Sequence, residues 1–202
     1  MRITKQRVDG NKARIVETAA ALFREKGFDG ISVADLMRAA GLTHGGFYNH
    51  FESKNELEAV ACAQVFGNSV AGIDAVAGIA DPTERARAFD GYKRRYVSKK
   101  ARDAVAARCP MVAFAGDVSR QPQSVREAYA SGLRRYLDAF ARASATDKIG
   151  GRRHENARRR AIAQFAALAG ALTLARSVAD ADPALSDEIL KAAIADLDPA
   201  AG

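Results

Sequence analysis

The stretch of sequence that decides the fold runs from Thr43 to Phe51 and reads THGGFYNHF. Gly45 and Gly46 stand side by side in a segment otherwise suited to a short helix, although glycine lowers the stability of helices. Such a pair is understandable where the backbone must come close to another molecule. The N-terminal end of a helix that enters the major groove of DNA meets this condition.

The residues before this stretch predict two further helices. Asn11 can cap the first of them, whose apolar residues recur at helical spacing. Ser32, followed three residues later by an acidic residue, can cap the second, which ends at Gly41. Thr43 can cap the third helix. Residues 11 to about 52 are therefore predicted to form three short helices, the second and third joined in a helix-turn-helix.

The rest of the chain also reads as helices. Ser53 and Glu56 form a capping-box pair that opens a long fourth helix. Prolines mark later helix boundaries, at Asp81-Pro82, Cys109-Pro110, Gln121-Pro122 and Asp182-Pro183. No alternating strand pattern of useful length is found. The predicted class is all-α, with a helix-turn-helix domain over residues 1–55 and a second helical domain over residues 56–202.

Composition agrees with a soluble protein that has a polyanionic partner. The 202 residues carry a net charge of +7, and 48% of them are apolar, which is enough to fill a core. The N-terminus lacks the apolar stretch of a secretory signal, and Ala161–Ala175 is shorter than the ~18 apolar residues of a membrane span. The two cysteines have no disulfide-framework spacing. We therefore expect a cytoplasmic protein without membrane contact.

The helix-turn-helix resembles that of a known family. Thr43–Phe51 is followed by ESKNEL at residues 52–57. With the preceding positions, this pattern resembles the DNA-binding domain of the TetR/AcrR family of repressors; those positions are Phe23, Gly27, Phe28, Ser32, Val33, Leu36, Ala39, Ala40, Gly41 and Leu42. Phe47 departs from the Leu or Ile that is common in the family. The resemblance spans residues 11 to about 58, and beyond them only the layout of helices is similar.

The resemblance implies a homodimeric repressor of transcription that binds a palindromic operator in double-stranded DNA. It also implies that the second domain binds a small-molecule effector and carries the dimer contacts. A ligand there would change the separation of the two recognition helices by shifting the fourth helix. Neither a cofactor nor a metal ion is implied, and no catalytic residue.

Seven residues are expected to contact DNA. Hydroxyl, imidazole and ammonium groups bind phosphate oxygens or base edges, and Gly45 leaves room for the backbone to approach. The set consists of Ser32, Thr43, His44, Gly45, Tyr48, His50 and Lys54. Phe47 and Phe51 are expected to pack inward. Each polar residue also has a purely structural alternative, such as a helix cap for Thr43 or a half-buried ring for His50.

The central helices carry the candidates for an effector site. They are mostly apolar with a few hydroxyls, which favours a hydrophobic or aromatic effector. The candidates are Phe66, Phe89, Tyr92, Tyr96, Met111, Phe114, Tyr129 and Leu133. For each of them, an ordinary place in the core is the alternative.

Cys109 supports a more specific hypothesis. It precedes Pro110, so it would lie at a helix N-terminus, and Arg108 is adjacent. Both features lower the pKa of a thiol and raise its reactivity, so an electrophile or oxidant could be sensed by covalent modification. The alternative is a small buried residue without chemistry. Cys62 is expected to be part of the core.

A stripe of apolar residues predicts a helix that packs lengthwise on a partner. Its members recur at spacings of four and three, the pattern of a helical seam. The resemblance favours a dimer interface formed by Phe165, Leu168, Leu172 and Ala175. The alternative is that this stripe faces the core of its own chain.

Two other functions remain as alternatives. One is a basic DNA-binding protein that does not distinguish sequences. The other is an enzyme, but the three histidines, His44, His50 and His154, make no metal-ligand spacing with cysteine or carboxylate residues. No glycine-rich phosphate loop is found either.

Overall fold

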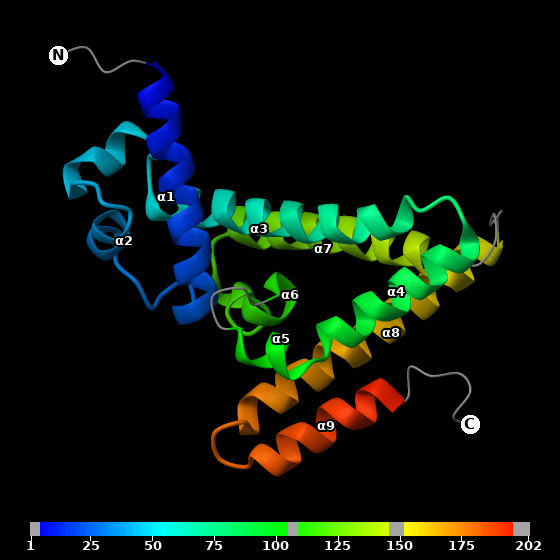
Figure 1. Ribbon diagram of the computed structural model, residues 1–202. Helices are drawn as coiled ribbons and strands as arrows, with labels where there is room; N and C mark the ends of the chain where they lie inside the picture. Colours follow the sequence, from blue (N-terminus) through cyan, green and yellow to red (C-terminus); the bar gives the residue numbers. More distant parts are fainter. Residues whose placement is uncertain (1–4, 105–108, 146–151, 196–202) are drawn as a thin grey trace. The chain divides into compact units, whose positions relative to one another are not determined.

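The computed structural model describes residues 5–104, 109–145 and 152–195, and every regular element in these ranges is helical (Figure 1). This confirms the predicted all-α class. The contacts divide the chain into two compact units. The N-terminal unit contains residues 1–68 and 106–132, and the C-terminal unit contains residues 69–105 and 133–202.

The grouping differs from a division at residue 55. Two long helices, α3 (Lys54–Ala77) and α7 (Gln123–Ala143), each give their first part to the N-terminal unit and the rest to the C-terminal unit. Residues 106–132, far along the sequence, join the helix-turn-helix because their contacts are made there.

The N-terminal unit begins with α1 (Lys5–Lys26) and α2 (Val33–Ala39). The 3₁₀ helix η1 (His44–Asn49) follows α2, and the beginning of α3 follows η1. The short elements α6 (Pro110–Ala113) and η2 (Val118–Arg120) complete the unit with the first part of α7. Helix α1 packs on α2 and on α6, and α2 packs on η1.

The helix boundaries confirm most of the predicted caps. The Ser32 hydroxyl accepts a hydrogen bond from the backbone N–H of Asp35 at 3.2 Å, and Ser53 does the same for Glu56 at 3.2 Å. Gly27 follows α1 with a φ of +76°, a conformation that favours glycine.

One predicted helix start is wrong, and one predicted cap residue makes no capping hydrogen bond. Helix α1 begins at Lys5, so Asn11 lies inside it and accepts a hydrogen bond from the Arg14 guanidinium instead of capping it. No proline precedes Asn11 to prevent the helix from starting earlier. Thr43 occupies the cap position of η1, but its side chain makes no capping hydrogen bond.

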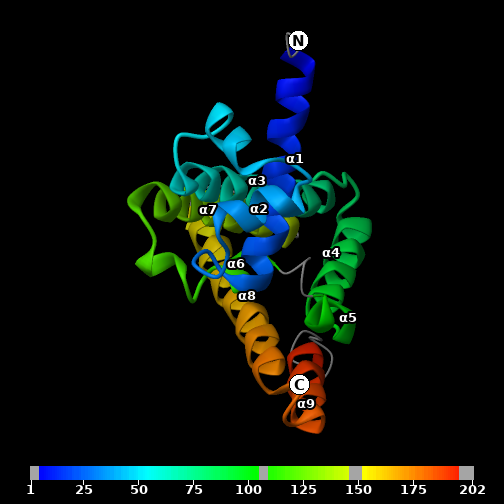
Figure 2. The same cartoon turned by 90° about the vertical axis from the view of Figure 1, so that its left-hand side faces the viewer.

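The C-terminal unit contains α4 (Pro82–Tyr96), α5 (Lys99–Asp103), α8 (Arg152–Val178) and α9 (Pro183–Ala195), with the later parts of α3 and α7. Helices α8 and α9 lie side by side in both views (Figures 1 and 2). Arg176 of α8 donates to the carbonyl oxygens of Ala101 and Arg102, so α8 also holds the end of α5.

Helices α3 and α8 are apolar over long stretches. By length and composition, α3 and residues 155–178 pass a simple test for membrane-spanning helices, which differs from the expectation for Ala161–Ala175. The core helices of soluble proteins pass the same test, so this is weak evidence for a membrane.

A close approach between α7 and α3 requires glycine at position 132. A Cβ atom on Gly132 would overlap the Cβ and ring atoms of Phe66, which is completely buried. These atoms lie near the backbone of Phe66, so the side chain cannot simply swing away. The approach therefore depends on the missing side chain.

We expect Gly132→Ala to lower the free energy of unfolding by about 1–3 kcal/mol, the usual cost of overpacking a core. As a control, Gly67→Ala on α3 adds a Cβ with no atom within 4 Å. It should stabilise the protein by about 0.5–1 kcal/mol, because alanine is the better helix former. Urea unfolding of both variants measures the difference, and equal stabilities would contradict the proposed overlap.

Candidate nucleic-acid interface

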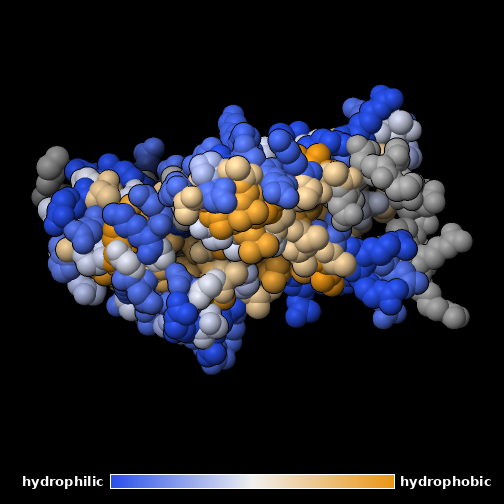
Figure 3. All heavy atoms as spheres, turned by 90° about the horizontal axis from the view of Figure 1, so that it is seen from below, coloured by the Kyte–Doolittle hydropathy of each residue, from blue (hydrophilic) through white to orange (hydrophobic). Residues whose placement is uncertain are grey.

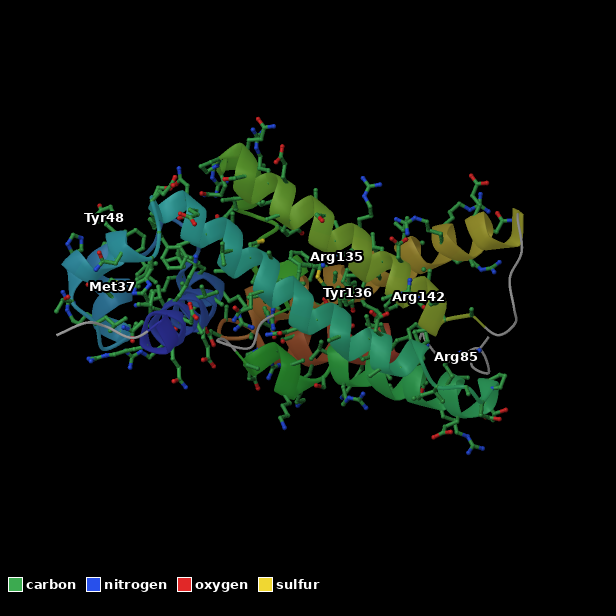
Figure 4. All side chains as sticks on the ribbon, turned by 90° about the horizontal axis from the view of Figure 1, so that it is seen from above. Met37, Tyr48, Arg85, Arg135, Tyr136 and Arg142 are labelled. Carbon is green, nitrogen blue, oxygen red and sulfur yellow. The ribbon has the colours of Figure 1, made fainter. Side chains whose placement is uncertain are left out.

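The η1 segment has one face in the core and one face on the surface. Phe47 and Phe51 are buried, with ring centroids 5.6 Å apart. The next residue after Phe47, Tyr48, is 65% exposed, and His44 is also exposed, with its ring edge-on to Tyr48 at 6.3 Å. The predicted inward packing of the two phenylalanines is confirmed. Figure 4 shows Tyr48 at the margin of the N-terminal unit.

The fold itself does not require glycine at position 45. A Cβ atom on Gly45 would have no neighbour within 4 Å, and the residue has no positive φ. A Cβ on Gly46 would lie 3.5 Å from the Thr43 hydroxyl and 3.7 Å from the terminal methyl of Met37, which is ordinary contact. Neither the space inside the protein nor the backbone conformation therefore explains the glycine pair.

The other predicted DNA contacts near η1 differ in their surroundings; they are Ser32, Thr43 and His50. Ser32 and Thr43 are exposed, and the Ser32 hydroxyl donates to the Asp35 carboxylate at 2.6 Å. His50 is half-buried, and its Nδ1 atom is covered without a hydrogen-bond partner among the described residues. The exposed hydroxyls are thus accessible to a ligand, whereas His50 is accessible only in part.

Lys54 differs from the prediction because its ammonium group is used inside the protein. It donates to the carbonyl oxygen of Phe28 at 2.6 Å and pairs with the Glu58 carboxylate at 3.2 Å. Glu58 is buried, which raises the pKa of its carboxyl group, and the charge of Lys54 partly opposes that rise. Lys54 therefore ties α3 to the loop after α1 rather than projecting toward a phosphate. The four-residue spacing of Lys54 and Glu58 was the sequence signal for this pair.

The candidate effector residues divide between the two units. Phe66, Met111, Phe114 and Tyr129 lie in the N-terminal unit; Phe89, Tyr92, Tyr96 and Leu133 lie in the C-terminal unit. Phe114 is completely buried against the ring of Phe28, so it is a core residue below the helix-turn-helix.

Two hydroxyl groups of this set, those of Tyr92 and Tyr129, have hydrogen-bond partners inside the protein. The Tyr129 hydroxyl donates to the Met111 carbonyl at 3.1 Å, and burial raises the pKa of Tyr129 to about 12. The hydroxyls of Tyr92 and Tyr136 lie 2.8 Å apart. Tyr136 is buried next to Phe165, at 4.8 Å between ring centroids. Figure 4 shows Tyr136 on α7.

Cys109 occupies the predicted position before α6. It is the N-cap residue of this helix, with Pro110 in the first turn, and its side chain is half-buried. The thiol lies 3.9 Å from the sulfur of Met111. Cys62 is completely buried, and burial raises the pKa of its thiol to about 12. Arg108, which entered the prediction, lies outside the described residues. Among the described residues, no group of three or more His, Cys, Asp or Glu side chains could hold a metal ion.

The predicted dimer stripe is directed into its own chain. Phe165, Leu168, Leu172 and Ala175 are all at most 5% exposed within the C-terminal unit. These four side chains therefore contribute to the core of their own chain, as in the alternative reading, and Leu168 also lines the groove between α8 and α9. Their part in a dimer interface stays a prediction. The apolar pattern alone does not distinguish a core face from a partner face.

A different face of α8 is apolar and open. With α9 it forms a groove lined mainly by small residues, in which Leu174 is 59% exposed. Figure 3 shows an apolar patch over these helices. The lining includes Ala163, Ala167, Gly170, Ala171, Leu174, Ile189 and Ala193. Alanine and glycine give little hydropathy contrast, so the sequence pattern did not reveal this face.

Residues 15–59 match the family model for bacterial regulatory proteins of the tetR family. The chain is 37% identical over 59 residues to the uncharacterized HTH-type transcriptional regulator YerO of Bacillus subtilis. The aligned segment covers 29% of this chain and 20% of YerO. The chain is 38% identical over 50 residues to the HTH-type transcriptional repressor KstR2 of Mycobacterium tuberculosis, and this aligned segment covers 25% of each protein. The matched segment thus spans only about a fifth to a quarter of these relatives.

The whole fold also has similar solved structures. The reduced form of Escherichia coli NemR superimposes with a TM-score of 0.73 at 19% identity, over 93% of this chain and 95% of NemR. A TetR transcriptional regulator from Chloroflexus aurantiacus gives a TM-score of 0.70 at 25% identity, over 95% of this chain and 94% of that one. The matched segment contains the complete Thr43–Phe51 stretch, and the helical fold is shared along the chain. Residues 15–59 therefore match the helix-turn-helix segment of the tetR family of bacterial regulatory proteins, and the fold of the chain is shared with these solved structures.

Proposed function

We propose that this protein is a repressor of transcription that binds a palindromic DNA operator as a homodimer and releases it when an effector binds. The observation that carries the proposal is the surface of η1. His44 and Tyr48 are exposed there, and Gly45 has open space beside it although the fold does not need a glycine. A requirement for close contact with an outside partner explains both features, and the match of residues 15–59 to the tetR family of bacterial regulatory proteins supports DNA as that partner. Such a regulator acts in the cytoplasm, where the DNA is.

Charge on the nearby helix supports a polyanionic partner. Arg7, Lys12 and Arg14 are exposed on α1, in a chain with a net charge of +7. Such residues strengthen binding to phosphates without reading the sequence. Specific readout must then come from η1, as expected for a recognition helix.

Selection of genomic DNA fragments by the purified protein, with random competitor DNA, tests this function. An enriched palindrome is expected, because two identical recognition helices related by a twofold axis read inverted half-sites. Binding that shows no enriched sequence and only weakens with salt would favour the alternative of a DNA-binding protein that does not distinguish sequences.

Gly45→Ala should weaken binding to the selected palindrome by at least about tenfold, equivalent to about 1.4 kcal/mol, because the new methyl group occupies the space that the DNA backbone needs. The thermal unfolding temperature should not fall, since the methyl group meets no protein atom within 4 Å. Fluorescence anisotropy with labelled operator measures the affinity. Gly72→Ala on α3, which also has open space, is the matched control and should bind normally. Normal affinity of Gly45→Ala would count against close approach at this residue.

The dimer is proposed to form through the open face of α8 and α9. Leu174 is 59% exposed at a groove whose small residues allow a second pair of helices to come close. Helix α8 has 27 residues and is about 40 Å long at 1.5 Å per residue, so it offers a long contact surface. An isologous interface of this kind gives the twofold symmetry that a palindrome requires.

Leu174→Arg should convert the dimer into monomers, because a charge would be buried without a partner at the interface. Size-exclusion chromatography with light scattering measures the mass. Gln64→Arg, on an exposed part of α3, makes the same change of charge elsewhere and should remain dimeric. A Leu174→Arg protein of unchanged mass would show that the subunits meet elsewhere.

The effector is proposed to be a hydrophobic compound or a thiol-reactive electrophile. Cys109 supports the second class: it occupies the N-cap position of α6, its side chain is half-buried, and it shares the N-terminal unit with the helix-turn-helix. Addition of its thiolate to an activated alkene forms one carbon–sulfur bond and breaks the π bond of the alkene. The resulting enolate takes a proton from water, so the step needs no oxidant. The enlarged side chain must then be accommodated at the start of α6.

Treatment with N-ethylmaleimide should add one equivalent at Cys109 and none at Cys62, since Cys62 is completely buried with its pKa raised to about 12. Operator affinity of the modified protein should fall at least about tenfold. Peptide mass spectrometry locates the adduct, and Cys109→Ser should keep its affinity after the same treatment. Full operator affinity with Cys109 modified would eliminate the electrophile hypothesis.

A further inference from the structure

The segment that follows α6 contacts the loop between α1 and α2. We call residues 114–121 the clasp segment. The Phe114 ring lies 4.7 Å from the Phe28 ring, with both residues completely buried. Asp117 fills the space beside Gly27, where a Cβ atom would come within 2.5 Å of the Asp117 carboxylate. Two neighbouring loop residues, Gly27 and Phe28, are thus contacted by two residues of the clasp segment that are three positions apart in the sequence.

A third contact continues this pattern. The Gln121 side-chain amide donates to the Asp29 carboxylate at 3.1 Å, and Gln121 is only 6% exposed. Asp117 thus lies beside position 27, Phe114 contacts position 28 and Gln121 contacts position 29. Positions 27, 28 and 29 are three consecutive residues of the loop. A buried amide group is rarely left without a hydrogen bond, so this contact has a defined geometry.

The loop determines where α2 begins. Only two residues separate Asp29 from Ser32, whose hydroxyl caps α2. Helix α2 packs on η1, which carries His44 and Tyr48. A displacement of the loop therefore moves the capped start of α2 and, through it, the segment proposed to read DNA.

The other end of the clasp segment is joined to α6 without a break. Phe114 is the C-cap residue of α6, and its backbone N–H donates to the Pro110 carbonyl at 3.0 Å. Cys109 occupies the N-cap position at the opposite end of this four-residue helix. Helix α6 is also held by the hydrogen bond from Tyr129 to the Met111 carbonyl. Movement of α6 is therefore transmitted directly to the Phe114 ring.

We propose that the clasp segment is a positioning element that holds α2 and η1 in the arrangement that binds the operator. Displacing α6 loosens its three contacts and lowers operator affinity without altering any DNA-contacting residue. This inference rests on the proposed function and adds the route by which an event at α6 affects DNA binding. Its residues act through the loop, so they are positioning residues rather than DNA contacts.

The Gln121→Glu variant tests the contact directly. It places a second carboxylate against Asp29 and replaces a hydrogen bond by charge repulsion. We expect operator affinity to fall at least about tenfold. Affinity for random DNA should remain within about twofold of the wild type, because the exposed basic residues of α1 are unchanged. A structural role without positioning would not produce this difference between operator and random DNA.

The double variant Asp29→Asn/Gln121→Glu restores a hydrogen bond with donor and acceptor exchanged. Its operator affinity should return to within about threefold of the wild type, and the two mutations should therefore be strongly coupled. Ser124→Glu, at an exposed position near the start of α7, makes the same change of charge and should bind normally. Circular dichroism confirms that each variant is folded before its affinity is measured.

Three results would overturn the clasp: normal operator affinity in Gln121→Glu, no recovery in the double variant, or an equal loss for operator and random DNA. If Gln121→Glu does not fold, Phe114→Leu serves instead, since it keeps an apolar side chain but removes the contact between rings. It should show the same selective loss of operator affinity, and normal affinity would again overturn the proposal. Failure of the proposed function is distinct, because the wild-type protein would then select no palindrome.

Discussion

Phe28 is the residue on which the packing of the N-terminal unit depends. Its ring lies 5.4 Å from Phe23 of α1 and 4.7 Å from Phe114, while its carbonyl oxygen accepts a hydrogen bond from Lys54 at the start of α3. Three segments that are distant in the sequence thus meet at one loop residue. The apolar ring is removed from water and the polar backbone group has a partner, so both requirements for burial are satisfied.

This arrangement separates the parts of the unit that maintain the fold from those that face outward. Phe47 and Phe51 bury one side of η1, whereas His44 and Tyr48 are exposed on the other. In the C-terminal unit the same division appears along α8. One stripe of this helix is buried with the aromatic residues of α4 and α7, and another forms an open groove with α9.

The sequence predicted what depends on local rules. The all-α class, the caps at Ser32 and Ser53, and the inward packing of Phe47 follow from short-range patterns and were correct. It failed where the answer depends on contacts between distant residues. Helical spacing identified the stripe containing Phe165, but it cannot tell whether such a stripe faces its own core or a partner.

The same limit applies to the candidate site. Lys54 had the charge and position of a phosphate contact, yet its ammonium group binds a carbonyl 26 residues away in the sequence. Phe114 had the character of a ligand-pocket residue, yet it packs below the helix-turn-helix. The first outcome depends on the loop after α1, and the second depends on residues 106–132 belonging to the N-terminal unit, which no local pattern indicates.

The exposed side of η1 has a consequence for evolution. Because the buried phenylalanines hold this segment in place, the outward residues His44, Tyr48 and Asn49 can be exchanged with little effect on folding. Under the proposed readout of DNA by this surface, duplicated copies of the gene acquire new operator preferences by a few substitutions while keeping the same stable scaffold. Selection can act on recognition and on stability almost independently, which lets one fold diversify into many regulators.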